Sequence, residues 1–290
     1  MTIFTVFTVL YTKSCPIGSI NNSDSSILDI SFIILLLMNS SISAVIITKN
    51  EEKNIERCIL SLAEVADEIL VVDSGSTDKT LDISLKLGAN VIESKWLGYA
   101  KTKNLGNTTA KHDIILSIDA DETLSPTLRK SILLQKKSGL PDAYSFNRLT
   151  NYCGKWIKHS GWYPDVKIRI FNKNNVYWTG DFVHETLQIP SEIDIIHFSG
   201  DLLHYSYNSK TDHISRTKKY AELSAEKMFN ANKSFGPLKP FISATAKFIK
   251  MYFLKLGFLD GRLGLQIAQI SAKGVYSKYS TLEEIKAAKK

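Results

Sequence analysis

The chain contains 290 residues, of which 44% are hydrophobic and 22% are charged. These values are close to the averages for soluble globular proteins, and they exclude a disordered tail protein, a collagen-like fibre and a polytopic membrane protein. At about 150 residues per domain, the length allows one large domain or two small ones. The 3 cysteines form neither a disulfide framework nor a CxxC metal site, which suits a reducing compartment.

The net charge of +7 is distributed unevenly. Residues 204–290 carry 16 Lys and Arg against 6 Asp and Glu, so this segment is strongly basic and the rest of the chain is slightly acidic. Such a segment is typical of a surface that meets phospholipid headgroups or nucleic acid, and a solvated basic surface is the alternative. No RNP, zinc-finger or basic-zipper signature accompanies it, so we expect no nucleic-acid partner.

Residues 1–41 are predicted to be an N-terminal extension. The apolar run 27–37 is eleven residues long and contains Asp29, whereas a helical membrane span needs about 20 apolar residues. The first residues lack the basic region and the cleavage site of a signal peptide. Met38 stands just before the first clear strand, and we expect it to be the natural start. A weak interfacial anchor is the alternative.

From Ile42 the sequence alternates between strand and helix patterns. Repeated units of this kind imply right-handed crossovers and a mostly parallel sheet, in which ligands bind beyond the carboxyl ends of the strands. Strands are predicted at 42–48, 68–73, 90–92 and 112–119, and helices at 54–65, 80–87 and 103–109.

Polar side chains follow three of these strands. The first ends in Thr48-Lys-Asn-Glu51, the second in Asp73-Ser-Gly-Ser76 and the fourth in Asp119-Ala-Asp-Glu122. Neither GxGxxG nor GxxxxGK[ST] is present, so neither the dinucleotide fingerprint nor the Walker phosphate loop is available to bind a pyrophosphate. The Asp-x-Asp pattern indicates another way to bind the pyrophosphate, in which carboxylates hold Mg²⁺ or Mn²⁺ and the metal binds the diphosphate oxygens.

These motifs together resemble a family 2 glycosyltransferase of the GT-A fold. The downstream motifs are similar to the branch of lipopolysaccharide-core and lipooligosaccharide β-1,4-glucosyltransferases, and the resemblance covers residues 42–279. Those motifs are Gly98-Tyr-Ala-Lys-Thr-Lys-Asn104, Gly161-Trp-Tyr-Pro-Asp165, Arg169-Ile-Phe171, Val183-His-Glu185 and Phe258-Leu-Asp-Gly-Arg262.

The resemblance implies an α/β GT-A domain with a mixed, mostly parallel sheet flanked by helices. We expect this domain over 42–205, with a nucleotide half at 42–125 and an acceptor half at 126–205. A basic, amphipathic helical region would follow at 206–290.

The resemblance also implies the roles of individual residues. Asp121 would be the direct metal ligand, and Asp119 would contact ribose or metal. The nucleotide would be contacted by Thr48, Asn50, Glu51, Asp73, Lys101 and Asn104. For Lys101 and Lys103, a solvated helix face is the alternative.

Inverting transfer requires a carboxylate that takes the proton from the acceptor hydroxyl. Glu185 and Asp165 are equal candidates, because both lie in polar, aromatic-rich sequence, and Asp181 is a weaker third. The alternative for either leading candidate is a loop carboxylate paired with Arg169 or Lys167.

His204 is a candidate metal ligand or diphosphate contact, with a structural histidine as the alternative. Residues 211–230 and 240–257 are predicted to be helical, and the second segment combines aromatic residues with lysines. It is too charged to span a bilayer, so it fits an interfacial helix or a helix packed on the catalytic domain.

We therefore expect a metal-dependent, inverting transferase that moves a hexose, with glucose as the first candidate, from a UDP-sugar to a lipopolysaccharide core or a related surface glycan. It would be cytoplasmic, at the inner face of the cytoplasmic membrane. One alternative is transfer to a polyprenyl phosphate. Another is a non-catalytic, membrane-surface protein that binds nucleotide sugars.

Overall fold

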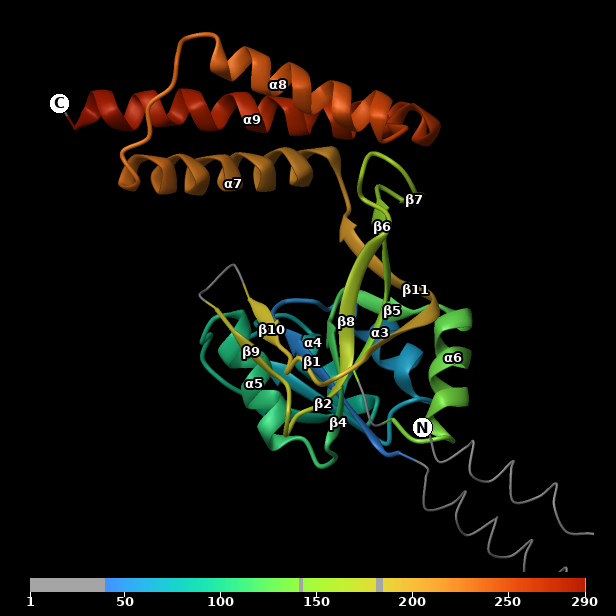
Figure 1. Cartoon of the computed structure of the whole chain (residues 1–290). Helices are drawn as coiled ribbons and strands as arrows, with labels where there is room; N and C mark the ends of the chain where they lie inside the picture. The colour runs from blue at the N-terminus through green and yellow to red at the C-terminus, as the bar shows by residue number, and fades with distance from the viewer. Residues whose placement is uncertain (1–39, 141–142, 181–184, 290) are drawn as a thin grey trace, which may run out of the picture. The chain divides into compact units, whose positions relative to one another are not determined.

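A computed structural model describes residues 40–140, 143–180 and 185–289 of the chain (Figure 1). The predictions for residues 1–39, including a natural start at Met38, lie outside the described residues, and so does the third base candidate, Asp181. Every predicted strand between Ile42 and Asp119 is confirmed within a residue or two at its ends.

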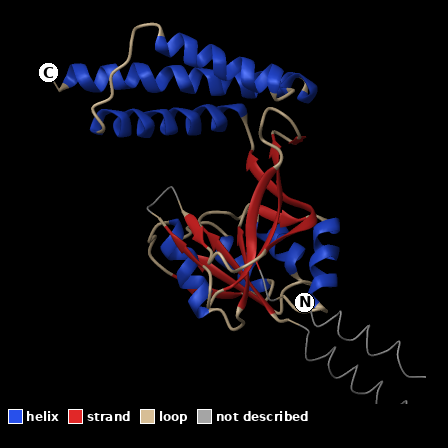
Figure 2. Cartoon of the chain, viewed as in Figure 1, coloured by secondary structure: helices blue, strands red, loops and turns tan. Residues whose placement is uncertain are grey.

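A mixed sheet forms the body of the fold (Figure 2). Within the described residues it has nine strands in the order β3-β2-β1-β4-β8-β6-β11-β5, with β7 paired to β6. Strands β3, β2, β1 and β4 are parallel, as predicted. A separate two-stranded ribbon joins β9 to β10. The bounds are β1 Ile42–Thr48, β2 Glu68–Asp73, β3 Asn90–Glu93, β4 Ile114–Asp119, β5 Glu122–Leu124, β6 Ala143–Tyr152, β7 Lys155–Ile157, β8 Asp165–Asn172, β9 Tyr177–Thr179, β10 Thr186–Gln188 and β11 Ile195–Tyr207.

Helices cover both faces of the parallel part of the sheet. Strand β1 is buried throughout, and its side chains alternate between the two faces. Ala44 and Ile46 pack with α3 (Ile55–Leu62), α4 (Thr80–Lys86) and α6 (Pro126–Lys136). Val45 and Ile47 pack with α5 (Tyr99–Thr109) and β9. A core on each side of the sheet explains why these strands are apolar along their whole length.

Helix α5 lies unusually close to the sheet because of Gly106. A Cβ atom at this position would lie 2.4 Å from Val45 Cγ1 and 2.8 Å from Val72 Cγ2. The helix begins at Tyr99, four residues earlier than predicted, directly after Gly98 with its φ of 88°. The sequence prediction missed this first turn, whose burial depends on the distant sheet.

The C-terminal region is helical, as predicted. Helix α9 (Arg262–Ala288) packs against both α7 (Lys210–Asn230) and α8 (Lys239–Ile249), as Figure 1 shows. A π-helical turn (Lys250–Leu254) and a 3₁₀ turn (Gly257–Asp260) connect α8 to α9. No helix in the described part of the chain is long and apolar enough to cross a membrane.

A carboxylate fixes these helices to the β6–β7 hairpin. Asp260 accepts hydrogen bonds from the backbone amides of Lys158 and His159, at 3.2 and 3.0 Å. Its Oδ1 also lies 3.1 Å from His159 Nδ1. Beside this contact, Met251 and Ile267 share an apolar cluster with Tyr152 of β6. Asp260, and with it the Phe258–Arg262 motif, therefore has a structural role.

Candidate active site

The loops that follow β1 and β2 are tied together at the edge of the sheet. Thr48 is level with Asp73 in the register of the two strands. Asn50, at φ 55°, accepts a hydrogen bond from Thr77 N at 2.8 Å and donates its own backbone N–H to Ser76 Oγ at 2.8 Å. The two loops therefore form one preorganised wall.

The predicted nucleotide residues lie along this wall. Asp73 is buried and accepts hydrogen bonds from the amides of Gly75 and Ser76 at 2.9 and 2.8 Å, so its carboxylate also shapes the turn. Burial raises the pKa of Glu51, although Asn54 donates a hydrogen bond to its carboxylate. The hydroxyl of Thr48 is buried and has no hydrogen-bond partner among the described residues, which leaves it available to a ligand.

Asp119, at the end of β4, is held between two buried cations. Its Oδ1 lies 3.2 Å from Lys103 Nζ, and its Oδ2 lies 3.1 Å from Arg169 Nη2. Burial by itself would raise the pKa of Asp119, but the charges of Lys103 and Arg169 hold it below its usual range. For Asp119, the protein itself supplies the compensating charge.

Glu122 is the fully buried centre of a second ion network. Its oxygens lie 2.8 and 2.9 Å from Arg169 Nη2, and Oε1 lies 3.2 Å from Arg148 Nη1. Arg148 also holds Asp165, with Nε and Nη2 at 2.9 and 2.8 Å from Oδ2. This network connects β5 to β6 and β8, and thus the predicted nucleotide half to the predicted acceptor half.

Asp121 faces His204 across the sheet edge. Strand β11 pairs with β5 so that His204 is level with Glu122, and this register brings His204 Nε2 to 3.2 Å from Asp121 Oδ2. Among the described residues, no group of three or more His, Cys, Asp or Glu is arranged to hold a metal. A carboxylate and an imidazole are nevertheless ligand types that suit Mn²⁺, and two protein ligands leave positions for diphosphate oxygens and water. The pair fits a metal that is shared with a diphosphate.

The two base candidates have different surroundings. Asp165 is paired with Arg148, and with Lys167 at 2.9 Å. Burial opposes ionisation, but Lys167 and Arg148 lower the pKa of Asp165. Glu185 is 24% exposed and lies 3.6 Å from Lys103 Nζ. The alternative pairing of Asp165 with Lys167 is therefore present, whereas Arg169 is directed to Asp119 and Glu122.

The polar residues of the motif on α5 lie in different surroundings. Lys101 is exposed, as on a solvated helix face, whereas Lys103 is 2% exposed and bridges Asp119 and Glu185. Asn104 bonds the backbone of Trp178 through both of its polar atoms, at 2.7 and 3.0 Å. Contact of Lys101 and Asn104 with the nucleotide stays a prediction.

The sequence did not mark Lys103, Glu122 or Arg148 as site residues. A signal existed for Lys103, because the small residues Ala100 and Gly106 lie three residues before and after it and mark the face of α5 that packs on the sheet. No local pattern marks Arg148, whose partners come from strands that are distant in sequence.

Known proteins resemble this chain over most of its length. Residues 43–190 match the model of the glycosyl transferase family 2. A relative described as an uncharacterized glycosyltransferase from Rickettsia bellii (strain RML369-C) is 32% identical over 266 residues, 86% of this chain and 88% of the relative. The lipopolysaccharide core biosynthesis glycosyltransferase LpsC of Rhizobium meliloti (strain 1021) is 26% identical, over 82% of this chain and 93% of LpsC.

Solved structures show weaker likeness. Glucosyl-3-phosphoglycerate synthase from Mycobacterium tuberculosis, crystallised with Mn²⁺, UDP and phosphoglyceric acid, is 25% identical with a TM-score of 0.33. That match covers 39% of this chain and 44% of the synthase. S. aureus TarS gives a TM-score of 0.40 at 18% identity, over 80% of this chain and 48% of TarS.

The assignment therefore comes from the family model and the sequence relatives, together with the GT-A arrangement of the sheet and its flanking helices. This chain belongs to glycosyl transferase family 2.

Proposed function

We propose that the protein is an inverting glycosyltransferase that moves a hexose, glucose in the first instance, from a UDP-sugar to a lipopolysaccharide core or a related surface glycan. The observation that carries this proposal is the facing pair Asp121 and His204, at 3.2 Å, beside the wall formed by the loops after β1 and β2. The similarity to LpsC, named for lipopolysaccharide core biosynthesis, supports the acceptor class.

In this proposal the donor lies along the edge of the sheet. Asp73, Asn50 and the hydroxyl of Thr48, which has no hydrogen-bond partner among the described residues, contact the nucleoside together with Glu51. Asp121 and His204 would hold Mg²⁺ or Mn²⁺, with Asp119, whose charge Lys103 compensates, two residues before Asp121. When bound, the ion supplies positive charge that stabilises the departing diphosphate.

Glu185 is the base that we propose. As the acceptor oxygen forms its bond to the anomeric carbon, the bond from that carbon to the diphosphate breaks, and the acceptor proton passes to a carboxylate oxygen of Glu185. Lys103, at 3.6 Å, positions this carboxylate. Asp165 is the weaker base because it accepts hydrogen bonds from Arg148 and Lys167, which lower its pKa.

The C-terminal helices would bring the enzyme to the surface of the cytoplasmic membrane. The segment from α8 to the 3₁₀ turn exposes large apolar side chains beside Lys239, Lys247, Lys250 and Lys255, which would meet anionic headgroups while the apolar groups enter the headgroup boundary. The exposed side chains are Leu238, Phe241, Ile242, Ile249, Phe253, Leu254, Leu256, Phe258 and Leu259.

Sedimentation with vesicles tests this membrane contact. The protein should co-sediment with phosphatidylglycerol vesicles in low salt, and less so with phosphatidylcholine vesicles. The double variant Phe253→Ser, Leu254→Ser should lose most of this binding, whereas Tyr220→Ser on α7, also an exposed aromatic position, should retain it. Equal sedimentation of both variants would contradict the proposal.

Donor hydrolysis tests the transferase itself. Protein would be incubated with UDP-, GDP- and dTDP-sugars in Mn²⁺, Mg²⁺ or EDTA, and the released nucleotide would be quantified. Metal-dependent release from one UDP-sugar is the expected result and names the donor. Absence of both release and donor binding would favour a non-catalytic protein. Activity toward polyprenyl phosphate that survives Glu185→Gln would favour the alternative acceptor, because that acceptor is already an anion.

A further inference from the structure

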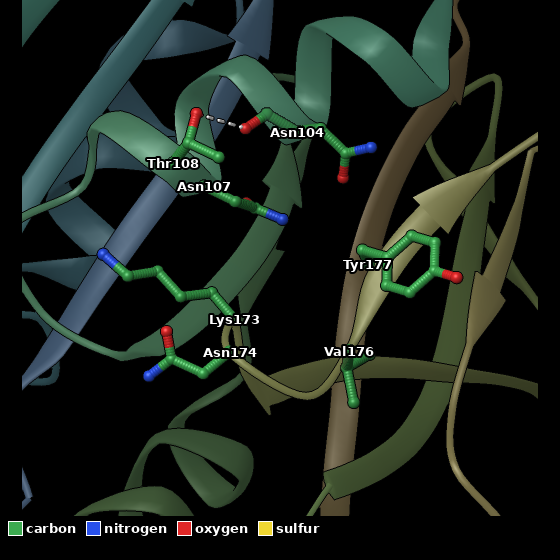
Figure 3. Close-up of a pocket in the computed structure, with 7 residues that line it drawn as sticks. All are labelled: Asn104, Asn107, Thr108, Lys173, Asn174, Val176 and Tyr177. Atoms are coloured by element: carbon green, nitrogen blue, oxygen red, sulfur yellow. Dashed lines mark hydrogen bonds between the residues drawn. The ribbon is translucent and has the colours of Figure 1, made fainter.

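A cavity of about 370 Å³ lies between α5 and the segment that joins β8 to β9 (Figure 3). Apart from Asn104, none of its lining residues is a predicted or proposed active-site residue. Trp178 of β9 contacts Lys103, and the neighbouring Tyr177 lines the cavity, so the cavity and the active site adjoin the same short strand. The lining residues are Asn104, Asn107, Thr108, Lys173, Asn174, Val176 and Tyr177.

The side chain of Asn107 is buried without a hydrogen-bond partner among the residues that the structure describes. The residue is 3% exposed, and neither Nδ2 nor Oδ1 has a hydrogen-bond partner among the described residues. Its carboxamide points into the space between Asn104, Lys173 and Tyr177 in Figure 3. Buried amides in folded proteins are almost always hydrogen-bonded. A molecule in the cavity that both donates and accepts would supply the missing partner.

The chemistry of the lining restricts that molecule. None of the lining residues is a carboxylate, so a metal cation has no suitable ligand set. The ammonium of Lys173 donates to the carbonyl of Ala110 at 2.6 Å, and its side chain extends away from Tyr177 in Figure 3, so we place no anion beside that ring. The remaining groups are carboxamides, the hydroxyl of Thr108 and the ring of Tyr177, which is 55% exposed.

Neutral amides beside an exposed aromatic ring suit a sugar. Each sugar hydroxyl donates and accepts a hydrogen bond, as the two polar atoms of Asn107 require. The apolar face of a pyranose can pack on the ring of Tyr177. The cavity is at the small end of the range for ligand pockets, about 300–1,000 Å³, which is adequate for one monosaccharide unit.

We propose that this cavity is a second, non-catalytic binding site for one neutral hexose unit, either a free sugar or a residue within a glycan. Asn107 follows Lys103 by four residues on the same face of α5, about 6 Å further along the helix axis. A glycan anchored there would be held about one helical turn from the proposed catalytic groups. This site goes beyond the proposed function, since its occupation requires no donor and no metal.

Saturation-transfer-difference NMR in EDTA, without nucleotide, tests the proposal. The probes are glucose, galactose, mannose and N-acetylglucosamine, each as the monosaccharide and as an oligosaccharide. Saturable binding of at least one sugar is expected, weakened at least tenfold by Asn107→Leu and by Tyr177→Ala. Tighter binding of the oligosaccharide would identify a glycan residue as the ligand, and equal binding would identify the single sugar.

The controls separate this site from the active site. Tyr220→Ala removes a similarly exposed ring on α7, and Asp121→Ala removes the proposed metal ligand, and both should bind sugar as the wild type does. If Asn107→Leu fails to fold, the loss of sugar binding in Tyr177→Ala, which changes an exposed side chain, serves as the test. The proposal is overturned if no sugar binds saturably, or if binding persists in the folded variants, because the amide of Asn107 would then be satisfied by water.

Discussion

Lys103 Nζ lies 3.2 Å from Asp119 Oδ1, so a lysine that is 2% exposed compensates the first acid of the Asp-x-Asp motif. The same ammonium lies 3.6 Å from Glu185 and 4.6 Å from the centre of the Trp178 ring. One buried cation on α5 therefore connects the proposed donor site with the proposed base. We therefore expect Lys103 to contribute to both the stability and the activity of the protein.

Replacing Lys103 by Met should impair both properties. Because the change leaves Asp119 with Arg169 as its remaining cation, we expect a loss of about 1–3 kcal/mol in the free energy of unfolding, measured in urea. Transfer should fall at least tenfold, since Glu185 loses its positioning contact. Lys101→Met, at an exposed position of the same helix, is the matched control for stability and should leave the free energy of unfolding unchanged. Equal free energies of unfolding in the two variants would contradict the stabilising role of Lys103.

Glu185→Gln separates the two base candidates. If Glu185 accepts the proton, kcat should fall about 10²–10⁴-fold, with little change in KM for the donor. Asp165→Asn should chiefly alter stability, because Asp165 forms ion pairs with Arg148 and Lys167. The reverse pattern in steady-state kinetics would make Asp165 the base.

His213 should make stability depend on pH. It is buried against Tyr152, with Nδ1 3.1 Å from the tyrosine hydroxyl, and burial lowers the pKa of His213 to about 4. The unfolded chain, with a histidine pKa of about 6.5, binds the proton first as pH falls. The free energy of unfolding should therefore be highest above about pH 6.5. It should fall toward pH 4, by about 3 kcal/mol at most, as the unfolded chain binds the proton.

Urea unfolding at several pH values between 4 and 7 measures this dependence. His213→Phe, which retains an aromatic ring, should flatten the profile in that window. His112→Phe is the control at a less buried histidine and should leave the slope as it is. An unchanged slope in His213→Phe would show that other groups cause the pH dependence.

Asp260→Asn should loosen the C-terminal helices from the β6–β7 hairpin. The change removes the charge that accepts the amides of Lys158 and His159, and the replacement amide can accept through one oxygen only. We expect about 1–3 kcal/mol of destabilisation. Hydrogen exchange at these two amides should accelerate at least tenfold, whereas exchange in β1 should change far less. Uniform acceleration across both regions would indicate global rather than local loosening.

The sequence predicted the parallel strands because β1, β2 and β4 are buried on both faces and therefore read as apolar runs. It also predicted the sheet edge at which Asp73, Asp119 and Asp121 appear, because the carboxyl ends of parallel strands coincide.

The local sequence could not predict which arginine side chains pair with the acids of the site. Arg169 and Arg148 reach Glu122 because β8 pairs antiparallel with both β4 and β6, and no turn signal encodes that register. Asn104 matches a family motif, but its carboxamide bonds Trp178, 74 residues away. Long-range pairing determines which polar residues meet.

The pairing of Asp121 with His204 is the central claim, and calorimetric titration of UDP with and without Mn²⁺ tests it most directly. Wild-type protein should bind UDP in Mn²⁺ and lose most of that affinity in EDTA. Asp121→Ala and His204→Ala should each weaken the metal-dependent binding at least tenfold, while Asp165→Asn should retain it. UDP binding that is the same in EDTA, or unchanged in Asp121→Ala, would contradict the metal site on which the account depends.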